Sequence, residues 1–188
     1  MIFHPASRTR RMGFSGMASI DRTAAGLDKH LDDDYHWFRS IGPGGIDVID
    51  AIVVGPGGTW TLTVAGERGR FARRNGHWYR WNRSTESWVP WDASPITAAR
   101  LAGRRLSLYL ERAGLPAAVE AILVPPTEME VIVDAGEAFG LTVQRDLGRV
   151  GSLVGAESRL SQSQVDRIVA LLDPRQPLPR LAQATPRG

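Results

Sequence analysis

The sequence predicts an α/β protein in which helices flank a mixed β-sheet. Segments with the alternating apolar pattern of strands and segments with the wider apolar spacing of helices follow the order helix, strands, helix, strands, helix. Glycine-rich turns separate the strands in the first half of the chain. The 188 residues are 43% hydrophobic and 23% charged, which is ordinary for one globular domain with a proper core.

Both ends of the chain are expected to lie outside this domain. Residues 1–18 are rich in Gly, Ser and Arg, which predicts a flexible arm. Residues 174–188 are rich in Pro, Arg and Gln, which predicts a disordered tail. The predicted domain therefore spans residues 19–173.

The first half of the domain is expected to contain a short helix and three strands. The helix covers residues 21–32, with Asp21 as its N-cap. The strands cover residues 35–41, 46–54 and 59–65, and GPGG at 55–58 turns the second strand into the third. Alternate residues of a strand point to opposite faces, so the third strand is expected to turn its large side chains, Trp60, Leu62 and Val64, toward the core.

A β-hairpin is expected next, in RFARRNGHWYRW. Asn75-Gly76 between two strand-like runs is the sequence signature of a two-residue type I′ turn. This turn would place three arginines opposite aromatic residues, in the pairs Arg73–Trp78, Arg80–Phe71 and Arg70–Trp81.

The second half is expected to hold two helices and three short strands. Residues 94–114 predict a helix with Ser94 as a cap, Pro95 at the first position and Gly114 after its end. Strands are expected over 119–124, 129–133 and 141–145. Residues 161–174 predict a closing helix, in which Ser161 and Gln164 form a capping box.

The composition limits the kinds of site and partner. The chain has no cysteine, which excludes disulfides and thiolate metal sites and favours a cytoplasmic location. No apolar run approaches 18 residues, so a membrane partner is not expected. The histidines show no metal-ligand spacing, and no P-loop or dinucleotide-binding pattern is present.

Several segments together resemble a known family. IDAIVVGPGGTW looks like an aspartate-bearing strand and its glycine turn, GERGRF follows it, and SPITAA opens the long helix. In order and spacing, from about Asp21 to Asp173, the chain is similar to the nuclease-related domain (NERD) family. That family is a branch of the PD-(D/E)xK nucleases, so the resemblance implies a restriction-endonuclease-like mixed sheet.

The resemblance also implies where a catalytic site would lie. In such nucleases an aspartate ends one strand and a Glu-x-Lys pair lies on the next, where two carboxylates hold Mg²⁺ and the metal activates water. The aspartate falls on Asp50, but the glutamate falls on Thr63 and the lysine on Ala65. Asp50 is therefore expected to be a vestige, and neither a metal nor a cofactor is expected.

An active nuclease remains an alternative if the carboxylates have been rebuilt around Asp50, Asp28 and Glu67. The lysine has no local replacement, because Lys29 is the only lysine in the sequence. Arginine is a poor base, since its pKa lies above 12. A Mg²⁺ cofactor would follow only from this alternative.

The strongest charge feature of the chain is an arginine-rich stretch over residues 66–83. It holds six arginines and one glutamate, a local net charge of +5 in a chain whose net charge is +3. Arginines neutralise phosphates and aromatic rings stack on bases, so this stretch is a candidate nucleic-acid surface. Its candidate residues are Arg68, Arg70, Arg73, Arg74, Trp78, Arg80, Trp81 and Arg83.

Three interpretations of the sequence follow. The preferred one is a catalytically inactive, nuclease-like domain that acts as a binding module, with nucleic acid as a candidate partner of its Arg/Trp-rich hairpin. The arginines and aromatic rings could instead stack only on one another. The same surface could also serve a protein partner or self-association.

Overall fold

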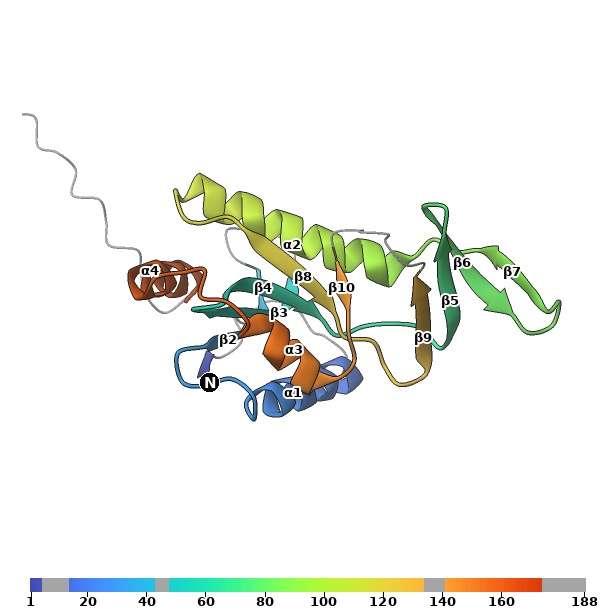
Figure 1. Ribbon diagram of the computed structural model, residues 1–188, viewed down its shortest axis with the longest axis horizontal. Coiled ribbons are helices and arrows are strands. Elements are labelled where there is room, and N and C mark those ends of the chain that lie inside the picture. The colour runs from blue at the N-terminus through green and yellow to red at the C-terminus, as the bar shows by residue number, and fades with distance from the viewer. Residues whose placement is uncertain (5–13, 43–47, 134–140, 174–188) are drawn as a thin grey trace, which may run out of the picture.

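The computed structural model describes residues 1–4, 14–42, 48–133 and 141–173 (Figure 1). The predicted tail, 174–188, lies outside the described residues. Within them, the predicted α/β class with mixed sheets flanked by helices is confirmed. The helices are α1 (Phe14–Leu27), α2 (Ser94–Arg112), α3 (Leu147–Val154) and α4 (Gln162–Leu172).

The larger sheet has six strands. Its order is β1 (Ile2–His4), β2 (His36–Ile41), β3 (Ile49–Gly55), β4 (Gly58–Thr63), β8 (Val119–Leu123) and β10 (Thr142–Val143). Strands β2, β3 and β4 form an antiparallel meander, while β8 is parallel to β4 and β10 is parallel to β8. Parallel neighbours need a long connection, and the segment between β4 and β8 includes α2 and the strands of a second sheet.

Helices cover both faces of this sheet. On one face, Trp37, Val53 and Trp60 share a core with α1 and α3. On the other face, Phe38 and Ile52 share a core with α2 and α4. Figure 1 shows α1 and α3 together on one side of the sheet and α2 on the other. The result is a three-layer arrangement in which each strand of the meander is buried on both faces.

The smaller sheet has four strands, in the order β7 (Ser87–Pro90), β6 (His77–Asn82), β5 (Gly69–Arg74) and β9 (Met129–Val133). Strands β5, β6 and β7 are antiparallel and lie between β4 and α2 in the sequence, whereas β9 comes from the segment after β8 and is parallel to β5. This sheet extends from one end of the molecule, with α4 at the other end (Figure 1).

The turn between β5 and β6 occupies Asn75 and Gly76, both with positive φ (49° and 79°). Strand pairs on either side of it match Arg74 with His77 and Arg73 with Trp78. Positive φ at both central residues belongs to a type I′ turn, in which glycine is free of the steric cost that other residues meet.

The prediction of a flexible arm over residues 1–18 is wrong at both ends of that range. Residues 2–4 form β1, where the Ile2 backbone N–H donates to the Tyr35 carbonyl oxygen at 2.7 Å. Helix α1 begins at Phe14 rather than at residue 21, and it ends at Leu27 rather than at residue 32. The buried residues Ile20, Ala24 and Leu27 have the helical spacing that anchors α1 to the sheet.

Two smaller expectations also differ from the structure. Ser94 is not the N-cap of α2: that position belongs to Ala93, and the Ser94 N–H donates to the Asp92 carboxylate at 3.1 Å. Helix α3 was not expected, because two glycines interrupt its sequence. Gly151 is required there by close packing, since a Cβ atom would lie 2.5 Å from the Cβ of His30. The capping box of α4, with Ser161 and Gln164, is confirmed.

Candidate functional site

Asp50, the aspartate of the nuclease resemblance, has a structural partner. It lies on β3, and its Oδ2 accepts a hydrogen bond from the Val64 backbone N–H at 2.9 Å. Burial raises the pKa of Asp50 above its ordinary value, and the hydrogen bond from Val64 opposes that rise. The carboxylate therefore satisfies the backbone just beyond the end of β4.

The face of β4 that a nuclease would use is closed. Its threonines, Thr59, Thr61 and Thr63, are all buried. Helix α2 lies over this face: a Cβ atom at Gly103 would be 3.4 Å from Thr61 Oγ1 and 3.1 Å from the Ala121 Cβ. The opposite face carries Trp60 and Leu62 in the core, as expected. Sequence alternation alone could not indicate that α2 also covers the threonine face.

The three carboxylates of the rebuilt-site alternative each have a different environment. Asp50 binds the Val64 N–H, and Asp28 follows α1 with a half-exposed side chain. Glu67 accepts a hydrogen bond from Trp91 Nε1 at 3.3 Å and lies 4.0 Å from the Arg80 guanidinium. Within the part of the chain that the structure describes, no three His, Asp or Glu residues come together as a metal site.

Ala65, which takes the lysine position in the nuclease resemblance, lines a pocket of about 600 Å³. We call it the Ala65 pocket. It lies beyond the carboxyl ends of the parallel strands β4 and β8, the place where open α/β sheets commonly bind ligands. Its walls come from α1, the two strand ends and α3, and include Ser19, Arg22, Thr23, Ala65, Gly66, Pro126, Glu128 and Leu147.

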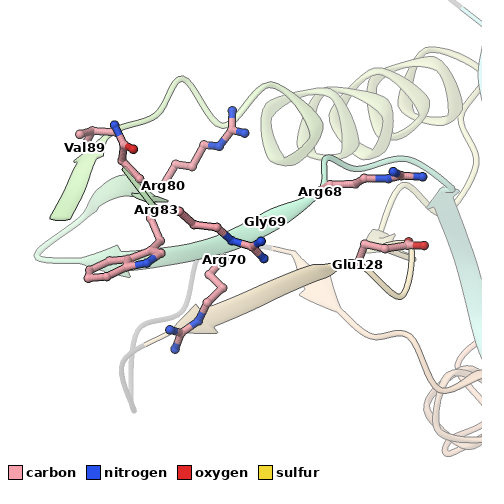
Figure 2. A pocket seen from close by; sticks show the side chains of 9 residues that line it. Arg68, Gly69, Arg70, Arg80, Arg83, Val89 and Glu128 are labelled. Atoms are coloured by element: carbon pink, nitrogen blue, oxygen red, sulfur yellow. The ribbon is translucent and has the colours of Figure 1, made fainter. Parts of the chain in front are cut away.

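A second pocket, of about 660 Å³, lies at the end of the smaller sheet where β5 begins and β6 ends. We call it the arginine pocket. It is lined by Arg68, Gly69, Arg70, Arg80, Trp81, Asn82, Arg83, Val89 and Glu128. Figure 2 shows Arg68 and Glu128 on the side nearer the larger sheet, and Arg80, Arg83 and Val89 toward the other side. Four arginines from the two strand ends thus line this pocket, and their side chains point in different directions (Figure 2).

Two of these four arginines already have acidic partners. Arg70 Nε donates to Glu130 Oε2 at 2.9 Å across the β5–β9 pair. Arg80 lies 4.0 Å from Glu67. Within the described residues, neither Arg68 nor Arg83 forms an ion pair. Among the described residues, the two arginines Arg68 and Arg83 thus have no ion-pair partner, although Glu128 lines the same pocket.

An aromatic row continues from the pocket across one face of the sheet. Trp81 meets Trp88 edge to face, with ring centroids 5.3 Å apart and planes at 65°. The Arg74 guanidinium lies over the Trp88 ring, 5.0 Å from its centroid. Trp88 was missed by the sequence analysis; its signal was the strand-like SWVP that follows the hairpin.

Five of the expected nucleic-acid residues thus line one pocket: Arg68, Arg70, Arg80, Trp81 and Arg83. The other three lie elsewhere. Arg73 and Arg74 are close to the hairpin turn, at the opposite end of β5. Trp78 packs edge-on against Trp91, 5.9 Å away, and joins the hydrophobic cluster under α2. The open end of the sheet, rather than the turn, is where the charges gather.

A scan against protein-family models, a search of curated proteins and a search of solved structures each found no match for this chain. None of the described helices is long and apolar enough to cross a membrane. The functional conclusion therefore depends on the geometry of the two pockets.

Proposed function

We propose that this protein is a catalytically inactive, nuclease-like domain that binds nucleic acid through the arginine pocket. The observation that carries the proposal is the gathering of Arg68, Arg70, Arg80 and Arg83 around one concave surface beside Trp81. Arginines neutralise the phosphate backbone, and an aromatic ring among them offers a stacking surface for a base.

The loss of catalysis is supported by the residues around Asp50. In the nuclease-like arrangement that the sequence resembles, the aspartate and the glutamate lie on neighbouring strands. Asp50 and Thr63 have that relationship, because β3 and β4 pair with Ala51 opposite Leu62. The carboxylate and the lysine are replaced by Thr63 and Ala65, and Thr63 is buried. A single carboxylate gives Mg²⁺ too few ligands.

The relative position of the two pockets supports a nucleic-acid partner over an unrelated ligand. Glu128 lines both the Ala65 pocket and the arginine pocket. The basic surface is therefore adjacent to Ala65, the position that corresponds to the lysine of the nucleases that the sequence resembles. A strand held by the arginines would run past the remnant of the catalytic site.

Fluorescence anisotropy with labelled oligonucleotides tests the binding function. We expect the affinity to fall linearly with salt on a double-logarithmic plot between about 50 and 300 mM salt. Changing Arg68 and Arg83 together to Gln should weaken binding and make the slope shallower by about 0.7–0.9 per lost phosphate contact.

The matched control removes two arginines at the other end of the molecule. Arg112 ends α2 and Arg167 lies on α4, and both are exposed. The Arg112→Gln, Arg167→Gln protein has the same net charge as the pocket variant and should keep the wild-type slope. Equal losses in both variants would mean that binding reflects net charge alone, and an absence of binding at low salt would overturn the proposal.

Incubation with Mg²⁺ and DNA tests the lack of catalysis. We expect no cleavage that depends on both Mg²⁺ and Asp50. Cleavage by the wild-type protein that Asp50→Asn abolishes would show that the site is active after all.

A further inference from the structure

The charges of the arginine pocket are unequal in a way that defines a phosphate position. Glu130 and Glu67 accompany Arg70 and Arg80, whereas Arg68 and Arg83 have no ion-pair partner among the described residues. Arg68 immediately precedes β5 and Arg83 immediately follows β6, and both line the same pocket. Two arginines without an ion-pair partner among the described residues, in the lining of one pocket, favour a bound phosphate.

Trp81 supplies a second, different kind of contact. Trp81 lines the pocket, and its ring meets the Trp88 ring in an edge-to-face contact. A ring supported on its edge keeps its orientation, while the pocket gives access to it. A nucleic-acid base is a flat partner that stacks on such a ring whatever its sequence.

The size of the pocket favours single-stranded over double-stranded nucleic acid. About 660 Å³ lies within the range of pockets that enclose one small ligand, and so suits one nucleotide. In a duplex, the bases are stacked within the helix and present only their edges in the grooves. An unpaired base can therefore stack on a ring at the edge of such a pocket, whereas a paired base cannot.

We propose that the arginine pocket holds one nucleotide of a single strand, with its phosphate held by the arginines that line the pocket and its base stacked on Trp81. The inference rests on the proposed function, and it adds that the protein discriminates single strands from duplexes. The salt dependence comes from the arginines, and the discrimination comes from Trp81.

The first experiment compares a labelled single strand of about 20 nucleotides with the duplex of the same sequence. Removing the ring with Trp81→Leu should weaken single-strand binding roughly 5- to 150-fold, while duplex binding changes little. Trp81→Phe keeps a stacking surface and should retain most of the preference. Neither change should alter the salt slope, because the arginines remain.

Competition experiments with the wild-type protein avoid any effect of substitutions on folding. A nucleoside monophosphate should displace the labelled single strand at a lower concentration than inorganic phosphate does, because only the nucleotide reaches Trp81. Equal potency of the two competitors would overturn the stacking of a base.

The outcomes separate this inference from the proposed function. Equal affinity for single strand and duplex, with a normal salt slope, would leave a nucleic-acid-binding protein and overturn the single-nucleotide site. No binding to either form would overturn both. A preference that Trp81→Leu removes and Trp81→Phe retains would support both.

Discussion

The Asp50 carboxylate accepts a hydrogen bond from the Val64 backbone N–H at 2.9 Å, so the start of β3 is joined to the chain just beyond β4. In the nuclease arrangement this carboxylate would bind a metal. In this structure the carboxylate is largely buried and accepts a hydrogen bond from the backbone. An amide oxygen can fill this role as well as a carboxylate.

The Asp50→Asn protein is therefore expected to be at least as stable as the wild type at neutral pH. Asparagine can still accept from Val64, and it removes a charge whose burial is unfavourable. Asp50→Ala leaves the N–H without its acceptor and should be less stable than Asp50→Asn by about 1–3 kcal/mol. Urea unfolding at pH 7 measures both differences.

The buried Asp50 carboxylate predicts that the stability of the protein depends on pH. Burial raises the pKa of Asp50 in the folded protein above its ordinary value of 3.8, so the folded state holds the proton more tightly than the unfolded state. The wild type should thus lose stability relative to Asp50→Asn as the pH rises through and above 3.8. Unfolding across that pH range tests this. If the stability difference between Asp50→Asn and the wild type shrinks with rising pH, a partner such as a metal ion favours the charged carboxylate.

Neutralising the Glu67 side chain should strengthen nucleic-acid binding. In Glu67→Gln, the side chain can still accept from Trp91 Nε1, but Arg80 loses its acidic neighbour. A freed guanidinium can contact one more phosphate, which steepens the salt slope by about 0.7 for a single strand. Glu130→Gln should act likewise through Arg70. Anisotropy measures both, and an unchanged slope in both variants would contradict the placement of the phosphate backbone.

Gly57→Ala should destabilise the protein strongly. A Cβ atom at this position would lie 1.7 Å from the Val154 carbonyl oxygen, so α3 would have to move away from the β3–β4 turn. We expect a loss of about 2 kcal/mol or more. Gly76→Ala is the control: no atom of the described residues lies within 4 Å of its Cβ position, and only its φ of 79° costs about 1–2 kcal/mol. Comparable losses in the two proteins would mean that α3 packs less closely than the structure indicates.

His36 should make the protein sensitive to mild acid. Burial lowers the pKa of His36, and the neighbouring His4 ring, with its Nε2 3.0 Å from His36 Nδ1, lowers it further. A base with a lowered folded-state pKa contributes stability that is present above its ordinary value of 6.5 and lost as the pH falls below it. His36→Gln should therefore flatten the fall in unfolding free energy between about pH 7 and 5. An equally steep fall in the variant would assign the effect to another group.

The parts of the fold that follow local rules could be predicted from the sequence. Strands β3 and β4 have apolar runs bounded by a glycine turn, and α4 has a capping box that specifies where it begins. Strand β1 could not be predicted, because three residues carry little pattern and their strand exists through pairing with β2. Helix α3 was hidden because Gly148 and Gly151 weaken its helical signal while allowing His30 to approach.

The candidate site was predictable in its chemistry but not in its position. Residue types revealed the excess of arginine near tryptophan. They could not show that Arg70 and Arg80 would be paired with acids, because Glu130 reaches Arg70 from a distant part of the chain. Nor could they show that Trp78 would join the core while Trp81 lines a pocket, since that depends on how the smaller sheet packs against α2.

The smaller sheet takes its strands from two stretches of chain, one before α2 and one after β8. Deleting β5, β6 and β7 alone would leave β9 with an unpaired backbone edge, beside the already exposed Ile132, and such an edge promotes aggregation. Deleting β9 alone would expose the same kind of edge on β5. Removing this sheet without exposing a strand edge therefore requires changes in both stretches together, so the two form one structural unit despite their separation in the sequence.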